Sequence, residues 1–293
     1  MVTIFTPSFN RASFLPRVYE SLCKQTSKDF EWLIVDDGST DNTREVIYQI
    51  KAKHTVPFPI RYIYKQNGGK HTAINLGAKE AKGELFLILD SDDSLPADSV
   101  AYILSEYKEV ANSGNLAGVC GLMAHHDGTL IGSGFPKDQL VANSLEQRYK
   151  YGVTGDLTEV WKTDVLREFP FPEISGERFC PEQLVWFRIA RKYKLSCFNK
   201  IIYFRDYLDG GLTDNIVKVR MKSPIASTMC YAELNQYEIP IMQKLKAAIN
   251  YWRFRFCVTD AVPSSIGGHW LLIIPIAYLM HLVDMYQLKK IEK

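Results

Sequence analysis

The sequence lacks the cysteine patterns of a zinc site or a disulfide framework. Its six cysteines lie far apart, with no CxxC pair and no histidine at zinc-ligand spacing. We therefore expect them to be reduced core residues. The chain also lacks an excess of one charge, with 35 Lys plus Arg against 33 Asp plus Glu. This balance provides no general attraction to nucleic acid, and no nucleic-acid partner is expected.

A secretory leader, internal repeats and low-complexity tracts are also missing. Residues 1–6 already read as a strand, which leaves no room for a charged segment followed by an apolar one. A cytoplasmic location is therefore expected. With 46% hydrophobic and 23% charged residues, the 293-residue chain has the composition of a folded globular protein rather than a disordered one.

The first half of the chain alternates short apolar runs with amphipathic stretches, the pattern of βαβ units and a mainly parallel sheet. The predicted strands are residues 2–6, 30–35, 60–64 and 85–89. Helices are predicted after Ser13 and after Asp41, each acting as an N-cap, and over residues 72–81, with Gly83 ending that helix. A further helix is predicted over residues 181–193, and the sequence at 263–268 is the best candidate boundary.

Three aspartates within four residues follow the apolar run at 85–89, namely Asp90, Asp92 and Asp93. Ligands of open parallel sheets bind beyond the carboxyl ends of the strands, which is where this cluster stands. Crowded carboxylates repel one another unless water or a cation neutralises them, and hard oxygen ligands suit Mg²⁺ or Mn²⁺. The alternative is that Asp92 or Asp93 merely caps the next helix, around residues 98–112.

Two more polar segments follow predicted strands and should face the same crevice. Asp36 and Asp37 come after residues 30–35, where a carboxylate can accept from a base N–H or a ribose hydroxyl. A turn before a capped helix would explain the next residues, 38–41, without any ligand. Residues 67–70, which end in Lys70, allow close backbone approach to a phosphate but lack the Walker spacing.

With these motifs in one order, the chain resembles the family 2 glycosyltransferases, inverting enzymes of the GT-A fold. The matching motifs are residues 6–11 (TPSFNR), 35–41 (VDDGSTD), 73–77 (AINLG) and 89–93 (LDSDD). The resemblance is strongest over residues 1–125 and extends to about residue 205. It implies an α/β fold of GT-A type: a Rossmann-like mixed, mainly parallel sheet flanked by helices, with a helical C-terminal extension.

The resemblance also implies roles for individual residues. Asp36 and Asp37 match the family's acidic contact to the base, and Asp90 and Asp92 match the DxD motif, which holds Mn²⁺ or Mg²⁺. The remaining residues of the expected nucleotide site are Thr6, Pro7, Ser8, Asn10, Lys70 and Ser91. Residues 207–213 (YLDGGLT) resemble the Gly-rich segment that closes over the diphosphate, although a surface turn explains them equally well.

The family's catalytic base usually ends a Glu-Asp type pair at the start of a helix. Here the matching pair is Pro181 and Glu182, so Glu182 is the expected base. The competing interpretation is a first-turn glutamate that the helix dipole favours.

The expected domains are a GT-A catalytic domain at 1–215 and a helical extension at 216–293. Within the first, the nucleotide-sugar half covers about 1–115 and the acceptor half about 116–215. The implied function is transfer of a sugar from a nucleotide diphosphate sugar, with UDP favoured, to a glycan or lipid-linked saccharide in cell-surface polysaccharide synthesis. The alternatives are a non-catalytic GT-A partner subunit and a sugar nucleotidyltransferase, although the Gly-rich basic signature of the latter is missing near the first strand.

The C-terminal tail mixes apolar, aromatic and basic residues. Residues 270–280 carry no charge, but this run is shorter than the ~20 apolar residues of a membrane span, and Pro275 interrupts it, so no span is predicted. Lys289, Lys290 and Lys293 follow. Two interpretations stay open: peripheral attachment to the inner face of the cytoplasmic membrane, or a helix that packs on the catalytic domain or against another subunit, as in a homodimer.

Overall fold

The computed structural model describes residues 1–53, 56–205, 215–259 and 262–291. The segment at 207–213 that resembles a closing loop therefore lies outside the described residues. The chain divides into two compact units, Met1–Pro170 with Ile189–Asp206, and Phe171–Arg188 with Tyr207–Lys293. The boundary between the two units falls inside helix α6 (Glu182–Ala190).

The first unit is built on an eight-stranded sheet with the order β3-β2-β1-β4-β7-β5-β8-β6. The strands are β1 (Val2–Ser8), β2 (Phe30–Asp36), β3 (Ile60–Tyr64), β4 (Leu85–Ile88), β5 (Leu116–Ala124), β6 (Leu140–Ala142), β7 (Leu157–Lys162) and β8 (Lys194–Phe204). β1 to β4 pair in parallel, as do β5 and β8, whereas β7 and β6 pair antiparallel with their neighbours. The predicted mixed, mainly parallel sheet is confirmed.

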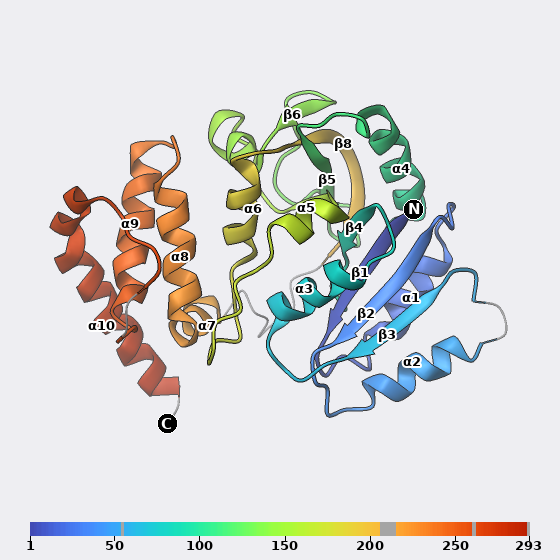
Figure 1. Ribbon diagram of the computed structural model, residues 1–293, viewed down its shortest axis with the longest axis horizontal. Helices are drawn as coiled ribbons and strands as arrows, with labels where there is room; N and C mark the ends of the chain where they lie inside the picture. The colour runs from blue at the N-terminus through green and yellow to red at the C-terminus, as the bar shows by residue number, and fades with distance from the viewer. Residues whose placement is uncertain (54–55, 206–214, 260–261, 292–293) are drawn as a thin grey trace. The chain divides into compact units, whose positions relative to one another are not determined.

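Helices cover both faces of this sheet (Figure 1). The helices and helical turns of the first unit are α1 (Leu15–Cys23), α2 (Thr43–Lys51), α3 (Lys70–Glu80), α4 (Ser99–Val110), η1 (Glu146–Lys150) and α5 (Thr163–Glu168). Side chains of α1, α2 and α4 share one buried cluster with alternate residues of β1, such as Val2 and Ile4. The residues between them face α3, where Phe5 of β1 stacks on Phe86 of β4 with ring centroids 5.0 Å apart. β1 therefore contributes to the core on both faces, as its continuous apolar run requires.

Four local sequence predictions need correction. The N-cap of α2 is Asn42 and not Asp41, although Asp41 Oδ1 accepts from the Thr43 N–H at 3.1 Å. The N-cap of α1 is Phe14 and makes no side-chain capping bond, so Ser13 does not cap that helix. Gly83 does not end α3, which stops at Glu80. A Cβ on Gly83 would lie 2.3 Å from the backbone nitrogen of Thr3, so the glycine allows close approach to β1. Asp98 precedes α4, so neither Asp92 nor Asp93 is its N-cap.

The regular secondary structure of the second unit is all helical within its described residues. Besides most of α6, it contains α7 (Ile216–Lys222), α8 (Pro224–Asn235), α9 (Ile241–Arg255), η2 (Gly268–Ile273) and α10 (Ile274–Ile291). Pro275 is the second residue of α10, a position where a missing backbone N–H leaves no intrahelical bond unmade. Pro275 consequently does not interrupt the helix, contrary to the sequence prediction. Residues 268–288 form a helical stretch long and apolar enough to cross a membrane by length and composition.

Candidate active site

The polar segments that follow β1, β2 and β4 meet at the carboxyl edge of the sheet because these strands are parallel neighbours. Lys70, the first residue of α3, reaches the carboxylate after β4, with its Nζ 2.7 Å from Oδ1 and 3.0 Å from Oδ2 of Asp90. Arg11, in the segment after β1, lies 4.0 Å from Asp92 Oδ2. The segments predicted to face one crevice therefore lie together at one edge of the sheet in the first unit.

Asp37 is buried, at 3% exposure, and holds the glycine turn before α3. Its Oδ1 accepts from Lys65 Nζ at 2.6 Å and from the Gly68 backbone N–H at 2.9 Å. Its Oδ2 accepts from the Gly69 N–H at 2.7 Å. Gly69 has a φ of +97°, a left-handed conformation that suits glycine and places its N–H toward the carboxylate.

Asp36 is also buried, at 1% exposure, and is engaged within the chain. It accepts from the Ser39 N–H at 2.7 Å and from the Tyr62 hydroxyl at 2.6 Å. The expected contact of Asp36 and Asp37 with a nucleoside base stays a prediction. What the structure shows is that both carboxylates hold the turns at this edge of the sheet.

The four remaining residues of the β1 edge differ in how their polar atoms are used. The Thr6 hydroxyl accepts from the Trp32 indole at 3.0 Å, and Pro7 pairs in register with Val35. Asn10, with a φ of +54°, accepts from the Thr40 N–H at 2.8 Å. The Ser8 hydroxyl, unlike these groups, makes no hydrogen bond within the described residues.

Ser8 is 2% exposed, and its Oγ has no hydrogen-bond partner among the described residues. A buried hydroxyl without a partner costs free energy. Ser8 pairs in register with Asp36 at the end of the strands, so its unused donor lies at the edge where the nucleoside site was predicted. A ligand hydroxyl or carbonyl is one partner that would satisfy it.

The acidic turn after β4 has two partly exposed carboxylates and one buried one. The side chains of Asp90 and Asp92 are 32% and 26% exposed, whereas Asp93 and Ser91 are buried. Tyr203, near the end of β8, accepts from the Asp90 backbone N–H at 3.0 Å and donates to Asp93 Oδ2 at 2.7 Å. Its single hydroxyl therefore joins both ends of the turn.

Burial and neighbouring charges shift the pKa values of two aspartates in this turn in opposite directions. Burial acts to raise the pKa of Asp90, but Lys70, with help from Arg205 and Arg11, outweighs it and holds that pKa below its ordinary value. Burial, with the nearby charge of Asp90, raises the pKa of Asp93 to about 7. Asp90 is thus kept ionised, while the buried Asp93 binds its proton more readily.

Tyr203 and Arg205 belong to this site, although neither was a candidate from sequence. Arg205 follows β8 and pairs with Asp156 at 2.9 Å, and the charges of Asp93, Asp156 and Asp90 together raise its pKa despite burial. The rule that singled out the other segments, a polar residue directly after an apolar run, would also have found Arg205 after residues 201–204.

The donor set at this turn fits a magnesium or manganese ion of the kind that binds with its substrate. No group of three or more His, Cys, Asp or Glu side chains within the described part of the chain is arranged to hold a metal by itself. Mg²⁺ is usually held by one or two carboxylates together with substrate phosphates and water. Asp90 and Asp92 provide such carboxylates, and Lys70 and Arg11 beside them now partly neutralise the charge.

Glu182 belongs to the second unit and is the first residue of α6. Its side chain is half-buried. The predicted helix over 181–193 is present in shortened form, and the role of Glu182 as a base stays a prediction.

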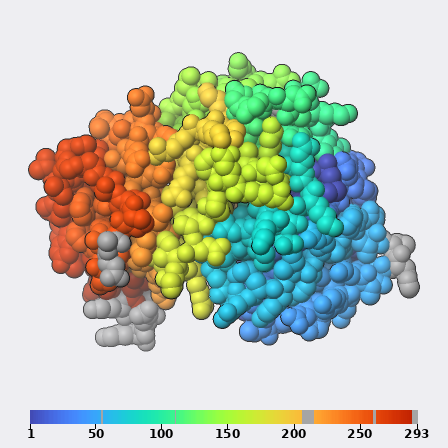
Figure 2. All heavy atoms as spheres, viewed as in Figure 1, coloured from blue at the N-terminus to red at the C-terminus, as the bar shows by residue number. Residues whose placement is uncertain are grey.

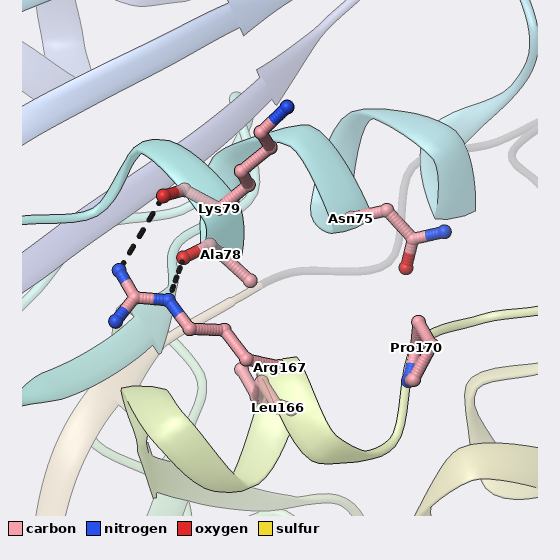
Figure 3. Close-up of a pocket in the computed structure, with 6 residues that line it drawn as sticks. All are labelled: Asn75, Ala78, Lys79, Leu166, Arg167 and Pro170. Carbon is pink, nitrogen blue, oxygen red and sulfur yellow. Dashed lines mark hydrogen bonds between the residues drawn. The ribbon is translucent and has the colours of Figure 1, made fainter.

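A separate cavity of about 260 Å³ lies between α3 and α5 and contains none of the predicted site residues. It is lined by Asn75, Ala78, Lys79, Leu166, Arg167 and Pro170 (Figure 3). The Arg167 guanidinium donates to the carbonyls of Ala78 and Lys79 at the end of α3. These bonds account for the position of the Arg167 side chain at the end of α3.

Comparison with known sequences agrees with this geometry. The family model described as "Glycosyl transferase family 2" matches residues 3–156, more than half of the chain. An uncharacterized glycosyltransferase of Rickettsia felis is 28% identical over 263 residues, which cover 85% of this chain and 37% of that protein. The chondroitin synthase of Pasteurella multocida is 37% identical over 137 residues, 46% of this chain and 14% of the synthase. The chain thus spans little more than a third of these curated relatives at most.

Solved structures show the same fold at low sequence identity. S. aureus TarS 1-349 in complex with UDP-GlcNAc superposes with a TM-score of 0.60 at 19% identity, covering 87% of this chain and 72% of that one. The mannosyltransferase PcManGT from Pyrobaculum calidifontis, solved with GDP-Man and Mn²⁺, gives a TM-score of 0.57 at 17% identity, covering 98% and 82%. The GT-A type of fold predicted from sequence is confirmed.

The family match begins in β1 and ends just before β7, so it includes the polar segments after β1, β2 and β4 that meet at the edge of the sheet. This chain belongs to glycosyl transferase family 2.

Proposed function

We propose that this protein transfers a sugar, with inversion, from a nucleotide diphosphate sugar to a saccharide or lipid-linked acceptor in cell-surface polysaccharide synthesis. The observation that carries the proposal is the cluster of charged side chains at the carboxyl edge of β1, β2 and β4, where Lys70 contacts Asp90 and Arg11 lies near Asp92. Family membership argues against a sugar nucleotidyltransferase. A non-catalytic partner subunit predicts no turnover, which the assay below tests.

The donor nucleotide would lie along the edge of β1 and β2. The unpartnered Ser8 hydroxyl, with Thr6, Pro7 and Asn10 around it, would contact the nucleoside, and the turns held by Asp36 and Asp37 would shape the base pocket. Uridine is the favoured nucleoside, supported by the complex of TarS with UDP-GlcNAc. Lys70, beside Asp90 and Ser91, would bind the diphosphate.

Asp90 and Asp92 are the residues that would hold Mn²⁺ or Mg²⁺. When bound, the ion would offset negative charge on the departing diphosphate. The complex of PcManGT with Mn²⁺ supports this assignment. Lys70 and Arg11 already place positive charge beside Asp90 and Asp92, so these two carboxylates lie where a bound cation would also be stabilised.

Glu182 would take the proton from the acceptor hydroxyl while that oxygen attacks the anomeric carbon from the face opposite the leaving diphosphate. One displacement inverts the configuration, and no covalent intermediate forms. We assign the catalytic domain to residues 1–215, with a nucleotide-sugar half at 1–115 and an acceptor half at 116–215, and the helical extension to 216–293. The named activity of the Pasteurella relative supports a polysaccharide product, and a cytoplasmic site of action fits a nucleotide-sugar donor.

The decisive experiment measures thermal unfolding with UDP and Mn²⁺, together with sugar transfer from UDP-sugars. A ligand at 100 times its Kd adds about 2.7 kcal/mol to the stability of the native state. We expect UDP with Mn²⁺ to stabilise the wild-type protein and Asp92→Asn to abolish most of that gain. The matched control is Asp164→Asn on α5, whose side chain is 90% exposed. Stabilisation and transfer that are unaffected by EDTA would contradict the proposal.

A further inference from the structure

Helix α10 exposes an apolar surface that its own unit does not cover. Only 17% of the window within residues 268–288 is buried, which is unlike a core helix of a soluble protein. The residues of α10 that are both apolar and most exposed are Leu279 at 63%, Val283 at 56%, Ile276 at 54% and Tyr286 at 71%. Their spacing of three and four residues places them on one side of the helix.

The opposite side of α10 is a narrow stripe that packs within the second unit. Its buried residues Ala277 and Asp284 are seven apart, and Trp270 of η2 continues the spacing. Arg253 of α9 binds Asp284 with two hydrogen bonds, from Nε at 2.5 Å and from a terminal nitrogen at 2.6 Å. Phe256, just after α9, contacts Tyr278 with ring centroids 5.1 Å apart.

These contacts show how α10 runs relative to α9 and where its one acidic side chain lies. Arg253 faces Asp284 while the later residue Phe256 faces the earlier Tyr278, so α9 and α10 run antiparallel. Asp284 is the only Asp, Glu, Lys or Arg in residues 268–288, and it is paired and 5% exposed. The outward surface of this stretch therefore carries no formal charge from these residue types.

We propose that α10 lies in the plane of an anionic lipid bilayer, with Ile276, Leu279 and Val283 facing the acyl chains and Tyr286 at their boundary with the headgroups. Apolar side chains are exposed on the flanks of the helix as well, including Leu282 and Met285. A second copy of the chain would cover one face and leave those flanks in water, whereas lipid surrounds them. The atoms of α10 belong to the red surface of Figure 2.

Charge complementarity favours anionic lipid. After Asp284 the sequence carries Lys289, Lys290 and Lys293 against a single acidic residue, Glu292. Basic residues beside an apolar helix are attracted to anionic headgroups. Tyr278 and Tyr286 are aromatic side chains with a polar tip, which suits the boundary between headgroups and acyl chains.

The Arg253–Asp284 pair favours an in-plane helix over a spanning one. A spanning α10 would have to separate the pair and bury Asp284 in hydrocarbon, or take α9 with it into the bilayer. α9 carries Lys244 and Lys246, which are costly at the bilayer centre. An in-plane helix keeps the pair on the protein side.

The test is flotation of the full chain with vesicles of phosphatidylcholine alone or mixed with phosphatidylglycerol. We expect binding to the mixed vesicles, and an at least tenfold lower partition coefficient for Leu279→Glu/Val283→Glu. The control is Tyr48→Glu on α2, which is 55% exposed in the first unit and should bind as wild type does. Thermal unfolding of each variant checks that the exposed substitutions leave the fold intact. Because no donor is present, loss of lipid binding and loss of transferase activity are separate outcomes.

Three results would overturn the proposal. The first is no flotation of the wild type, or equal flotation of the double variant. The second is a lipid-free dimer in sedimentation that the double variant dissociates, which would assign the face to a second copy. The third is retention in cell membranes after alkaline carbonate extraction, which would indicate a span. Release by carbonate is the expected result.

Discussion

Tyr203 is the residue that joins the acidic turn to β8. Its hydroxyl contacts both the Asp90 backbone and the Asp93 carboxylate, so it sets the geometry of the turn without reaching a ligand itself. Tyr107 is a useful comparison because its hydroxyl also donates to a carboxylate, that of Glu84 at 2.6 Å, before β4 rather than after it. Comparing phenylalanine variants of the two tyrosines therefore distinguishes a general loss of stability from a change in the geometry of the acidic turn.

We expect Tyr203→Phe to raise the Mn²⁺ concentration that half-saturates the UDP-dependent thermal shift by roughly tenfold, equivalent to about 1.4 kcal/mol. Tyr203→Phe should lower stability by about 1–3 kcal/mol, because it leaves the buried Asp93 carboxylate without this donor. Tyr107→Phe should cost less, because its partner Glu84 is exposed to water. Only the first should weaken the metal response. Equal metal responses in the two variants would remove Tyr203 from any positioning role.

Glu182→Gln is the residue-scale test of the proposed base. General-base assistance is worth ~10² to 10⁴ in rate, so transfer should fall by about that factor. UDP with Mn²⁺ should still stabilise the variant, because Glu182 has no part in the proposed donor site. Gln183→Ala, a change at the exposed neighbour, should retain wild-type turnover. Unchanged turnover in Glu182→Gln would assign the base to another residue.

At the scale of elements, α3 contacts both the sheet and the acidic turn: it packs on β1 through Gly77, and its first residue, Lys70, binds Asp90. Gly77 lies against β1, where an added Cβ would be 2.3 Å from Phe5 Cε2. The ring of Phe5 is fully buried and stacked on Phe86, so it has little room to move. The glycine in the motif at 73–77 thus has a packing explanation.

We expect Gly77→Ala to lower the free energy of unfolding by roughly 1–3 kcal/mol, the usual cost of overpacking a core. Gly114→Ala is the matched control because a Cβ there meets nothing within 4 Å. Denaturant unfolding of both variants measures the difference. If the two glycines tolerate alanine equally, α3 packs less tightly on β1 than its contacts indicate.

At the scale of the whole molecule, the two compact units are stabilised by different chemistry. The first has a sheet covered by helices, whereas the second holds α9 and α10 together partly through Arg253 and Asp284, whose side chains are 15% and 6% exposed. Removing one partner of a buried pair leaves the other charge uncompensated. Such a loss typically costs 3–5 kcal/mol.

Asp284→Ala should therefore lower the unfolding free energy of the second unit by roughly 3 kcal/mol. Asp164→Ala, which removes an exposed ion pair with Arg167, should cost less than about 1 kcal/mol. Calorimetry compares the two variants directly. Similar midpoints for both would show that the pair is not an important stabiliser of the unit.

Much of the first unit could be predicted from sequence because its signals are local. Apolar runs predicted β1 to β4 to within a few residues, and polar residues after them predicted which segments meet. The helix end at Gly83 was wrong because this glycine is explained by the close approach of Thr3, a residue distant in sequence. Capping at Ser13 was wrong because α1 begins at Leu15, which makes Phe14 the N-cap. The interruption expected at Pro275 was wrong because its position within the helix, rather than its presence, decides its effect.

By itself, the sequence determined the family, the order of βαβ units and the acidic segments of the crevice, since periodicity and short motifs encode these. Tertiary structure alone decided the partners of those segments: Lys70 on Asp90, Tyr203 across the acidic turn, and Asp37 on the glycine turn. It also decided which side of α10 is buried. The physical reason is that such contacts join residues tens of positions apart, and no local pattern specifies which side chains the fold brings together.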